Sequence, residues 1–311
     1  MNTLSFPGLG LEFSLNRVAF NLFGKDIYWY GIIIACGFLL AVVFCLKVIA
    51  PKLCVDADKL LDALFPAVPA AIIGARIYYV IFYLDLYRDA AGRFQWGKAV
   101  AIWDGGLAIY GGLIAAALVG LIYCKVRKQP FLSYMDVACI GFLIGQIVGR
   151  WGNFVNVEAY GGVTAAPWRM CSESIAAELL AKGEITAEAA QQILDGTLGV
   201  HPTFLYESLW NLLGLALLLV LIHKGRRFEG QVFASYALWY GVGRTAIESL
   251  RTDSLYFFNT GLRSSQIVGI LSAAAALVFL IVRFKTAKPE DRPENKAKQK
   301  QEGDDHGGDP A

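Results

Sequence analysis

Long apolar runs alternate with short charged segments along almost the whole chain. Seven of these runs are long enough to cross the roughly 30 Å hydrocarbon core of a bilayer as helices: residues 29–50, 61–83, 107–124, 135–152, 205–223, 232–250 and 265–282. Glycines such as Gly105, Gly106, Gly111 and Gly112 recur among them, and close helix packing in lipid is enough to explain most of these small residues. The pattern predicts an all-α integral membrane protein of about seven transmembrane helices.

The composition supports a membrane protein rather than a soluble one. Of 311 residues, 56% are hydrophobic and 17% are charged, whereas soluble domains average about 45–50% and about 25%. The net charge of +2 gives no reason to expect a nucleic-acid partner. The six cysteines and three histidines lack the spacing of a zinc site or a disulfide framework, so we expect no metal.

Lysine and arginine gather in every second connection and after the last run, for example at residues 47–59, 125–128, 224–227 and 283–288. Because cytoplasmic loops are enriched in these residues, we expect the N-terminus outside and the C-terminus in the cytoplasm. The outer connections are then residues 88–101, 153–203 and 252–263, and the longest has an amphipathic helical part around residues 174–194.

The two ends of the chain differ in character. We expect no removable signal peptide, because the N-terminus lacks the basic region and apolar core of one, and we expect an amphipathic surface segment there instead. Residues 1–284 are predicted to form one membrane domain with the external loop 153–203. Residues 285–311 are predicted to be a disordered, charged cytoplasmic tail.

Charged residues inside the apolar runs are the strongest functional signal. An arginine at a helix centre costs about 2.5–3.5 kcal/mol on insertion scales, yet Arg76, Arg150 and Arg244 all lie within runs, as Glu248 does, and Glu207 opens one. Arg244 and Glu248 could be a buried pair that only joins helices. Three arginines without equal local acid are harder to explain in that way.

Spacing places several of these residues on shared helix faces. Tyr240, Arg244 and Glu248 are four apart, and Gln146, Arg150 and Asn153 also share a face. A guanidinium binds phosphate through two parallel hydrogen bonds, so these faces suit an anionic lipid headgroup. The many aromatic residues nearby are mostly explained by an interfacial belt, but Tyr30 and Tyr110 adjoin glycines and are better site candidates.

Six short motifs occur together in one order along the chain: IYWYGI, GARIYYV, GGLAIYGGL, GRWGNFVNVEAYG, HPTFLYE and YGVGRTAIESLR. In this order and on this pattern of runs, they resemble the bacterial prolipoprotein diacylglyceryl transferases. The resemblance implies a seven-span fold with an outward, lipid-accessible cavity in the bacterial cytoplasmic (inner) membrane. It implies no cofactor, and its partners are phosphatidylglycerol, membrane lipids and prolipoprotein signal peptides with a lipobox cysteine.

The implied reaction transfers the sn-1,2-diacylglyceryl group of phosphatidylglycerol to the lipobox thiol, forming a thioether and releasing glycerol phosphate. The family's important positions fall here on Tyr30, Arg150, Asn153, Glu158, Gly161 and Arg244, with Tyr240 and Glu248 in the last matching motif. Lipid binding is expected of Arg150, Arg244, Asn153, Tyr240, Arg76 and Gly161.

The general base stays open in this interpretation. Many family members have a histidine where this sequence has Tyr110, and a free tyrosine, with a pKa of about 10, is a poor base near neutral pH. Arg150 and Arg244 are expected to clamp the phosphodiester, while Glu158 or Glu248 orients an arginine or accepts the thiol proton. The catalytic candidates are thus Arg150, Arg244, Glu158, Tyr30, Asn153, Glu248 and Tyr110.

Two other classes of function fit parts of the sequence. A transporter would also explain intramembrane charge and glycine-rich helices, but no internal repeat is evident and the charged motifs gather on one side. A non-catalytic lipid-binding protein would bind phosphatidylglycerol without turnover. The ordered motifs favour the transferase over both.

Overall fold

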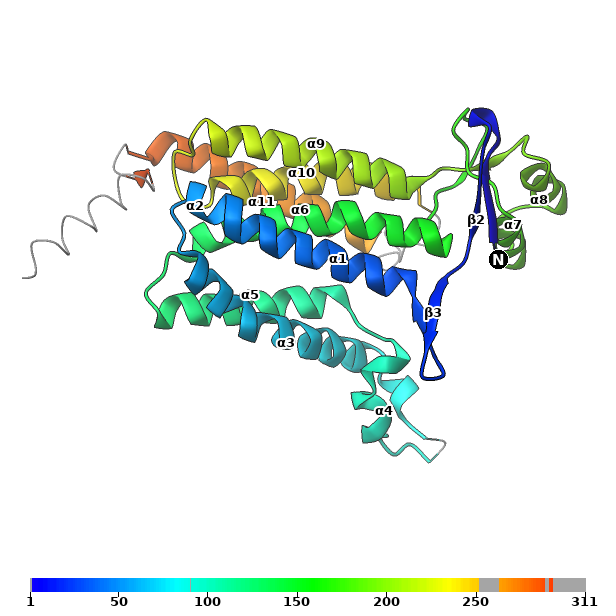
Figure 1. Cartoon of the computed structure of the whole chain (residues 1–311), viewed down its shortest axis with the longest axis horizontal. Coiled ribbons are helices and arrows are strands. Elements are labelled where there is room, and N and C mark those ends of the chain that lie inside the picture. Colours follow the sequence, from blue (N-terminus) through cyan, green and yellow to red (C-terminus); the bar gives the residue numbers. More distant parts are fainter. Residues whose placement is uncertain (1, 90, 252–262, 289–290, 293–311) are drawn as a thin grey trace, which may run out of the picture. The chain divides into compact units, whose positions relative to one another are not determined.

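The computed structural model describes residues 2–89, 91–251, 263–288 and 291–292, and it divides into two compact units. The smaller unit is Leu46–Met135, and the larger unit comprises the residues on either side of it. Figure 1 shows helices as the main element of both units. Each unit is described by itself.

The described part of the larger unit contains five long helices: α1 (Trp29–Phe44), α6 (Phe131–Asn156, which begins in the smaller unit), α9 (Thr203–His223), α10 (Gln231–Glu248) and α11 (Ser264–Thr286). The smaller unit pairs α3 (Ala57–Phe82) with α5 (Ile109–Val126), and it also holds the short helices α2 (Ala50–Lys52) and α4 (Trp96–Val100). Every one of the seven predicted runs coincides with one long helix. The chain is therefore an all-α integral membrane protein, as the sequence predicted.

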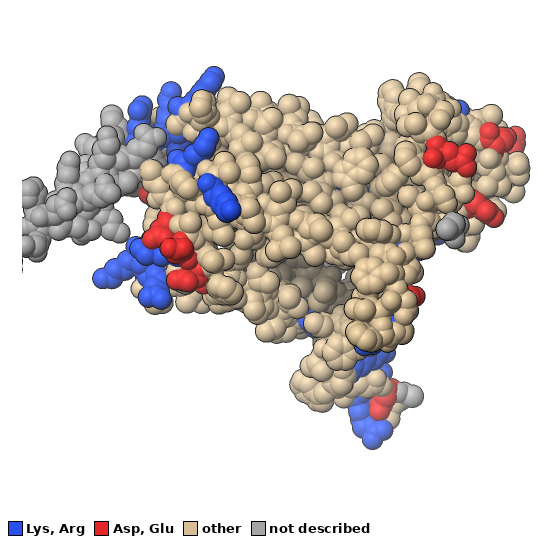
Figure 2. Space-filling view, in the orientation of Figure 1, with Lys and Arg blue, Asp and Glu red and all other residues tan. Residues whose placement is uncertain are grey.

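Six helices in the described part of the chain are long and apolar enough to cross a membrane. The exception among the seven predicted spans is α10, which carries Arg244 and Glu248 as well as several neutral polar residues. On the face formed by α1 and α9, the charged side chains lie at the helix ends and the surface between them is uncharged (Figure 2). The number of seven spans and their direction stay predictions.

Small residues and tryptophans hold α10 against its neighbours. A Cβ on Gly241 would meet the backbone of Gly269 on α11. On the α9 side, the indoles of Trp210 and Trp239 stack at 4.2 Å, and each indole N–H donates to the other residue's carbonyl, at 3.2 and 3.0 Å. Close backbone approach of this kind is how helices associate in lipid, and it fixes α10 beside α9.

A buried ion pair closes one end of the larger unit. Asp136 on α6 is fully buried and pairs with Arg226, from the connection between α9 and α10. The same carboxylate accepts hydrogen bonds at 2.8 Å from the backbone N–H groups of Gly230 and Phe233. It thereby satisfies donors at the start of α10 that have no partner within the helix, and it joins α6 to α10.

Beyond the other end of these helices lies a small head of strands and short helices. It is built from the hairpin β1 (Asn2–Phe6) and β2 (Leu11–Leu15), the helices α7 (Glu173–Ala181) and α8 (Ala187–Leu194), and the hairpin β5 (Val163–Thr164) and β6 (Gly199–Val200) (Figure 1). Leu4, Phe6, Ile175, Leu179 and Ile193 share its buried core. The helical part expected around residues 174–194 is confirmed as α7 and α8.

The N-terminal segment differs from its prediction. The expected amphipathic surface segment is instead two hairpins, β1–β2 and then β3 (Val18–Leu22) with β4 (Lys25–Tyr28). Leu4 and Phe6 alternate with polar residues at the strand period, and their side chains pack into the head core. Backbone hydrogen bonds of 2.9 Å in both directions join Ser5 to Cys171, so the head is a composite of the N-terminus and the long connection between α6 and α9.

The last helix, α11, ends at Thr286, two residues into the predicted tail. Most of that tail, residues 293–311, and most of the predicted outer connection 252–263 lie outside the described residues. The single membrane domain over residues 1–284 stays a prediction.

Candidate functional site

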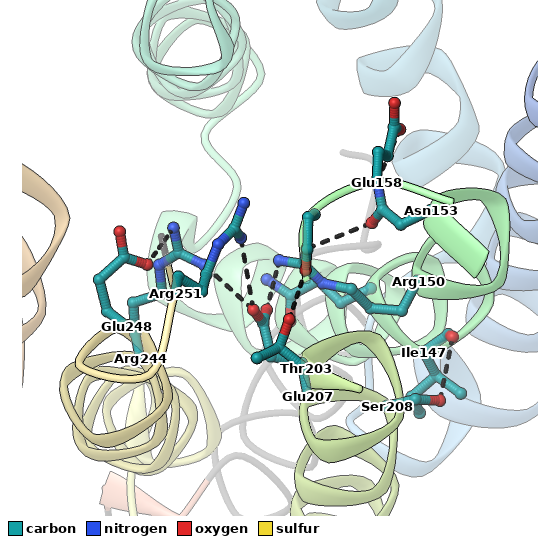
Figure 3. Close-up of polar contacts among 12 residues, drawn as sticks. Ile147, Arg150, Asn153, Glu158, Thr203, Glu207, Ser208, Arg244, Glu248 and Arg251 are labelled. Atoms are coloured by element: carbon teal, nitrogen blue, oxygen red, sulfur yellow. Dashed lines mark hydrogen bonds and ion pairs between the residues drawn. The ribbon is translucent and has the colours of Figure 1, made fainter. Parts of the chain in front are cut away.

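Glu207 is the centre of a polar cluster where α6, α9 and α10 meet. Its carboxylate pairs with Arg150 of α6, lies 3.3 Å from Nη1 of Arg244 on α10, and lies 3.6 Å from Nη1 of Arg251, just beyond α10. Arg244 also pairs with Glu248, one turn along α10, at 2.7 Å. We call Arg150, Glu207, Arg244, Glu248 and Arg251 the arginine cluster (Figure 3).

Charge and burial are unevenly divided within the arginine cluster. Three guanidiniums face two carboxylates, which leaves a formal charge of +1. The carboxylate side chains of Glu207 and Glu248 are 6% and 4% exposed, whereas those of the arginines are 12–19% exposed. The two carboxylates are therefore the buried side of the cluster, and the accessible side, formed by the guanidiniums, is positively charged. Such a surface suits a phosphate group.

Glu207 is itself held in place by its neighbours on α9. The Ser208 hydroxyl donates to the carbonyl of Ile147 on α6 at 3.2 Å, and the Thr203 hydroxyl donates to the carbonyl of Ala159 after α6. These two contacts fix the first turns of α9 against α6. Glu207 lies between Thr203 and Ser208 in the chain, so its backbone is fixed by these contacts and its carboxylate faces Arg150 (Figure 3).

A second polar branch leads from Arg150 toward solvent. Arg150 donates to the Asn153 amide oxygen at 3.2 Å, and the Asn153 amide donates to Glu158 at 2.9 Å. The Asn156 amide donates to the same Glu158 oxygen at 3.3 Å. Glu158 is exposed, so the branch links the arginine cluster to an accessible carboxylate.

Glu158 lies in a tight turn with an unusual backbone. Its two neighbours, Val157 and Ala159, have φ values of 53° and 55°, a left-handed conformation that is costly for residues other than glycine. The Glu158 N–H donates to the Asn153 carbonyl at 3.1 Å, which closes the turn directly after α6. Strain of this kind costs about 1–3 kcal/mol per residue and is concentrated at functional sites.

Gly161 is where the C-terminal ends of α6 and α10 and the N-terminal end of α9 come together. Its N–H donates to the His201 carbonyl, before α9, at 2.9 Å, and the next N–H, of Gly162, donates to the Leu250 carbonyl, after α10, at 2.7 Å. A Cβ on Gly161 would lie 2.7 Å from the Leu250 oxygen and 2.8 Å from the His201 Cβ. Only glycine fits this approach, so Gly161 shapes the site through the backbone.

His201 has a polar partner at the start of α9. Its Nδ1 lies 3.1 Å from the hydroxyl of Tyr206, and the same hydroxyl accepts a hydrogen bond from the Trp168 indole at 2.6 Å. Burial lowers the pKa of the His201 imidazole below its usual value. No group of three or more His, Cys, Asp or Glu side chains among the described residues is arranged to hold a metal ion.

The two predicted tyrosines of the larger unit lie on the helices of the cluster or beside them. The Tyr30 ring, at the start of α1, covers Gly152 of α6, where a Cβ would lie 2.7 Å from it. Tyr240 stacks on Tyr236 with ring centres 5.8 Å apart and lies one turn before Arg244 on α10. Both rings can line a ligand site that includes Arg150 and Arg244.

Arg76 and Tyr110 lie in the smaller unit. Arg76 is 7% exposed, and its guanidinium donates at 2.5–3.1 Å to five backbone carbonyls, those of Lys98, Ala99, Ala101, Gly105 and Gly106. Because a guanidinium has five N–H donors, these contacts give Arg76 a structural role in shaping residues 98–106. Tyr110 lies in the first turn of α5 and is 40% exposed. Lipid binding at Arg76 and catalysis at Tyr110 stay predictions.

Three members of the site were not among the residues predicted for it. From the sequence, Glu207 is identified only as a charge that opens an apolar run. Arg251 is only the last residue of the motif YGVGRTAIESLR, and Asn156 has no predicted role. The signal that could have found Glu207 is charge balance, because three intramembrane arginines need an acid within reach. Asn156 could not be found by spacing along α6 alone, since its contact with Glu158 depends on the turn that follows the helix.

The chain matches known proteins over most of its length. A family model described as prolipoprotein diacylglyceryl transferase matches residues 17–282. A phosphatidylglycerol–prolipoprotein diacylglyceryl transferase of Oceanobacillus iheyensis is 41% identical over 273 residues, which cover 88% of this chain and 89% of the relative. Proteins of the same description from Lysinibacillus sphaericus and Clostridioides difficile are 42% and 38% identical, over 90% and 88% of this chain and 96% and 98% of theirs.

Proposed function

Because the chain belongs to the prolipoprotein diacylglyceryl transferase family, we propose that it transfers the sn-1,2-diacylglyceryl group of phosphatidylglycerol to the lipobox cysteine of prolipoproteins. The cysteine thiolate attacks the glyceryl carbon that carries the phosphate. A carbon–sulfur bond forms, the carbon–oxygen bond to the phosphate breaks, and glycerol phosphate leaves. The peptide brings its own nucleophile, so neither a protein nucleophile nor an organic cofactor is needed.

The arginine cluster is the observation that carries this proposal. Arg150 and Arg244 come from different helices, and Glu207 holds them on the same carboxylate. Their accessible edges bind the phosphodiester, and they stabilise the negative charge that grows on the phosphate as it leaves. The same positive field favours the thiolate form of the attacking cysteine.

The remaining residues position the two substrates. Glu248 orients Arg244 through its 2.7 Å ion pair, and Asn153 and Tyr30 offer hydrogen bonds to the glycerol headgroup. Glu158 is held by two amides rather than by an arginine in the contacts described above. This leaves its carboxylate the better candidate for accepting the thiol proton.

The proposal includes a place in the cell. The protein spans the bacterial cytoplasmic membrane several times, with residues 1–284 as the transferase domain and residues 285–311 as a cytoplasmic tail. Lys224, Arg226 and Arg227 lie at the end of α9 and α10 opposite to the arginine cluster. Because basic connections stay in the cytoplasm, the cluster belongs to the outer half of the membrane.

The test is turnover with purified protein. The protein is incubated with phosphatidylglycerol and a lipobox peptide, and mass spectrometry detects a diacylglyceryl adduct on the peptide cysteine. The adduct should be absent with a peptide in which serine replaces cysteine, and strongly reduced in Arg150→Ala and Arg244→Ala. Near-normal rates in both folded variants would reject the phosphate-binding role, and no adduct from folded, lipid-binding wild-type protein would reject the transferase.

A further inference from the structure

Another polar contact joins α6 and α10 between the arginine cluster and Asp136, and the mechanism above does not use it. The Gln146 amide donates to the Tyr236 hydroxyl at 3.1 Å, and both side chains are half-buried. Gln146 lies four residues before Arg150, which is about 6 Å of helix rise. Tyr236 lies two turns before Arg244, and Tyr240 stacks on it from the turn between.

The Gln146–Tyr236 pair has unused hydrogen-bonding capacity. The amide has two N–H donors and the hydroxyl has one O–H donor, and the contact between them uses one of these three. The Gln146 carbonyl oxygen is buried and has no hydrogen-bond partner among the described residues. The two ends of an amide are interchangeable by a half-turn. In the turned orientation the carbonyl oxygen accepts from the Tyr236 hydroxyl, and the buried end that lacks a partner is the NH2 group, which is a donor. A buried polar group in this state calls for a ligand or a water.

The position of the pair indicates which ligand that is. Lipid offers no water at this depth to satisfy polar groups. When a phosphodiester lies on Arg150 and Arg244, the glycerol backbone and its ester carbonyls lie a few bonds away, toward the acyl chains. Ester carbonyls are hydrogen-bond acceptors without donors, so they can satisfy the two free N–H donors of the turned Gln146 amide.

We propose that Gln146 and Tyr236 form a binding subsite for an ester carbonyl of the diacylglyceryl group, so that the enzyme selects ester-linked lipid as its donor. The inference rests on the proposed function, and it adds the linkage of the acyl chains to what the site recognises. The phosphate on the arginine cluster and the carbonyl on the Gln146–Tyr236 pair are two anchors that flank the reacting carbon. Together they hold it in line with the attacking sulfur.

The experiment compares two donor lipids in the same protein preparation. Diester phosphatidylglycerol and its diether analogue share the headgroup, the phosphate and the bond that breaks, but the diether lacks the carbonyls. Adduct formation on a lipobox peptide is measured for each lipid by mass spectrometry, with the full-length protein in phosphatidylcholine nanodiscs. The ratio of the two kcat/KM values does not depend on the fraction of folded protein.

One hydrogen bond in this setting corresponds to about a fivefold preference for the diester. Because the contact exists both before and in the transition state, the preference should appear mainly in KM. Tyr236→Phe removes one oxygen atom, and Gln146→Leu/Tyr236→Phe removes the whole pair. We expect the double variant to lower the rate with the diester and leave the rate with the diether nearly unchanged, so that the ratio falls several-fold.

Ser235→Ala is the matched control, since Ser235 is the neighbour of Tyr236 on α10 and its hydroxyl donates to the Gln231 carbonyl at 2.8 Å within the helix. The control should keep the wild-type ratio. An unchanged ratio in Tyr236→Phe and in the double variant would mean that the pair holds a water or only joins helices, and it would overturn the subsite. An equal fall in Ser235→Ala would overturn it as well. No adduct from the wild type with either lipid would instead overturn the proposed function.

Discussion

Replacing Glu207 with glutamine tests whether this carboxylate organises the site. Glu207→Gln keeps the size and shape of the side chain but removes its charge. Arg150 loses its ion pair with Glu207, and Arg244 loses a charged contact at 3.3 Å. The formal charge of the arginine cluster rises from +1 to +2. The repulsion among Arg150, Arg244 and Arg251 is then offset by one carboxylate, that of Glu248, instead of two.

The magnitude follows from the contacts that are lost. Hydrogen bonds to charged groups contribute about 1.5–3 kcal/mol each, and the glutamine oxygen can still accept from one arginine. A loss of roughly 3 kcal/mol in transition-state stabilisation corresponds to about a 150-fold fall in kcat/KM. Removing one partner of a buried ion pair also destabilises a protein, by about 3–5 kcal/mol. The lower value applies here, because the arginines are 18–19% exposed and keep some access to solvent or headgroups.

The assay separates binding from turnover. Phosphatidylglycerol binding by Glu207→Gln should be equal to or tighter than that of the wild type, since the cluster is more positive. The kcat/KM for adduct formation should fall about 150-fold. Glu207→Asp keeps the charge and should recover part of the rate. Glu188→Gln, an exposed residue on α8, is the control and should change neither. A rate for folded Glu207→Gln within a few-fold of the wild type would refute the role of Glu207 as the organiser.

Three further predictions concern other parts of the molecule. Cys54 is exposed and lies in a predicted cytoplasmic connection. A membrane-impermeant maleimide should therefore label it in permeabilised spheroplasts but not in intact ones. Cys171 should stay unlabelled in both, because it is buried and burial raises the pKa of its thiol. Burial lowers the pKa of His201, so the imidazole binds a proton more tightly in the unfolded chain than in the folded protein. The contribution of neutral His201 to the free energy of unfolding is therefore present above about pH 6.5, and it is lost as the pH falls through the folded-state pKa. His201→Gln should therefore reduce the difference in Tm between about pH 7.5 and about pH 5.5. Gly161→Ala should destabilise the protein by about 1–3 kcal/mol and lower activity, because the new Cβ meets the Leu250 oxygen at 2.7 Å and neither backbone can yield.

Each of these predictions has its own control. Labelling of Cys54 in intact spheroplasts, abolished by Cys54→Ser, would show that the orientation is the reverse of the proposed one. A pH dependence of Tm that His201→Gln leaves unchanged would assign the effect to other groups. Gly97→Ala introduces a Cβ with nothing within 4 Å and should be silent, so an equal loss in Gly97→Ala would show that a Cβ clash does not explain the effect at Gly161.

The helical membrane part could be predicted from the sequence because lipid imposes a strong constraint. A segment in hydrocarbon must satisfy its backbone internally and be apolar over its length. Six of the seven helices therefore stand out by hydropathy, and α10 is the one that does not. The same constraint made Arg150 and Arg244 stand out, since charge within an apolar run is costly. Their helix faces followed from the period of 3.6 residues.

The head and its N-terminal hairpins could not be derived in this way. Leu4 and Phe6 alternate over a stretch too short to be distinctive, and their partners Ile175 and Leu179 lie far away in the chain. Such long-range packing has no local signature. The same holds for Gly161, which could be selected as a residue of interest but whose reason is the approach of Leu250 and His201.

The sequence by itself determined that this protein is a helical membrane protein with arginines inside its apolar runs, because hydropathy and helix period are properties of neighbouring residues. The tertiary structure alone decided that Glu207 holds Arg150 and Arg244 together, that Arg76 is engaged by five backbone carbonyls, and that Gln146 meets Tyr236. Each of these contacts joins segments that are separated along the chain. The packing of the helices sets the distances between these charges. Those distances decide which charges neutralise one another and which stay available for a substrate.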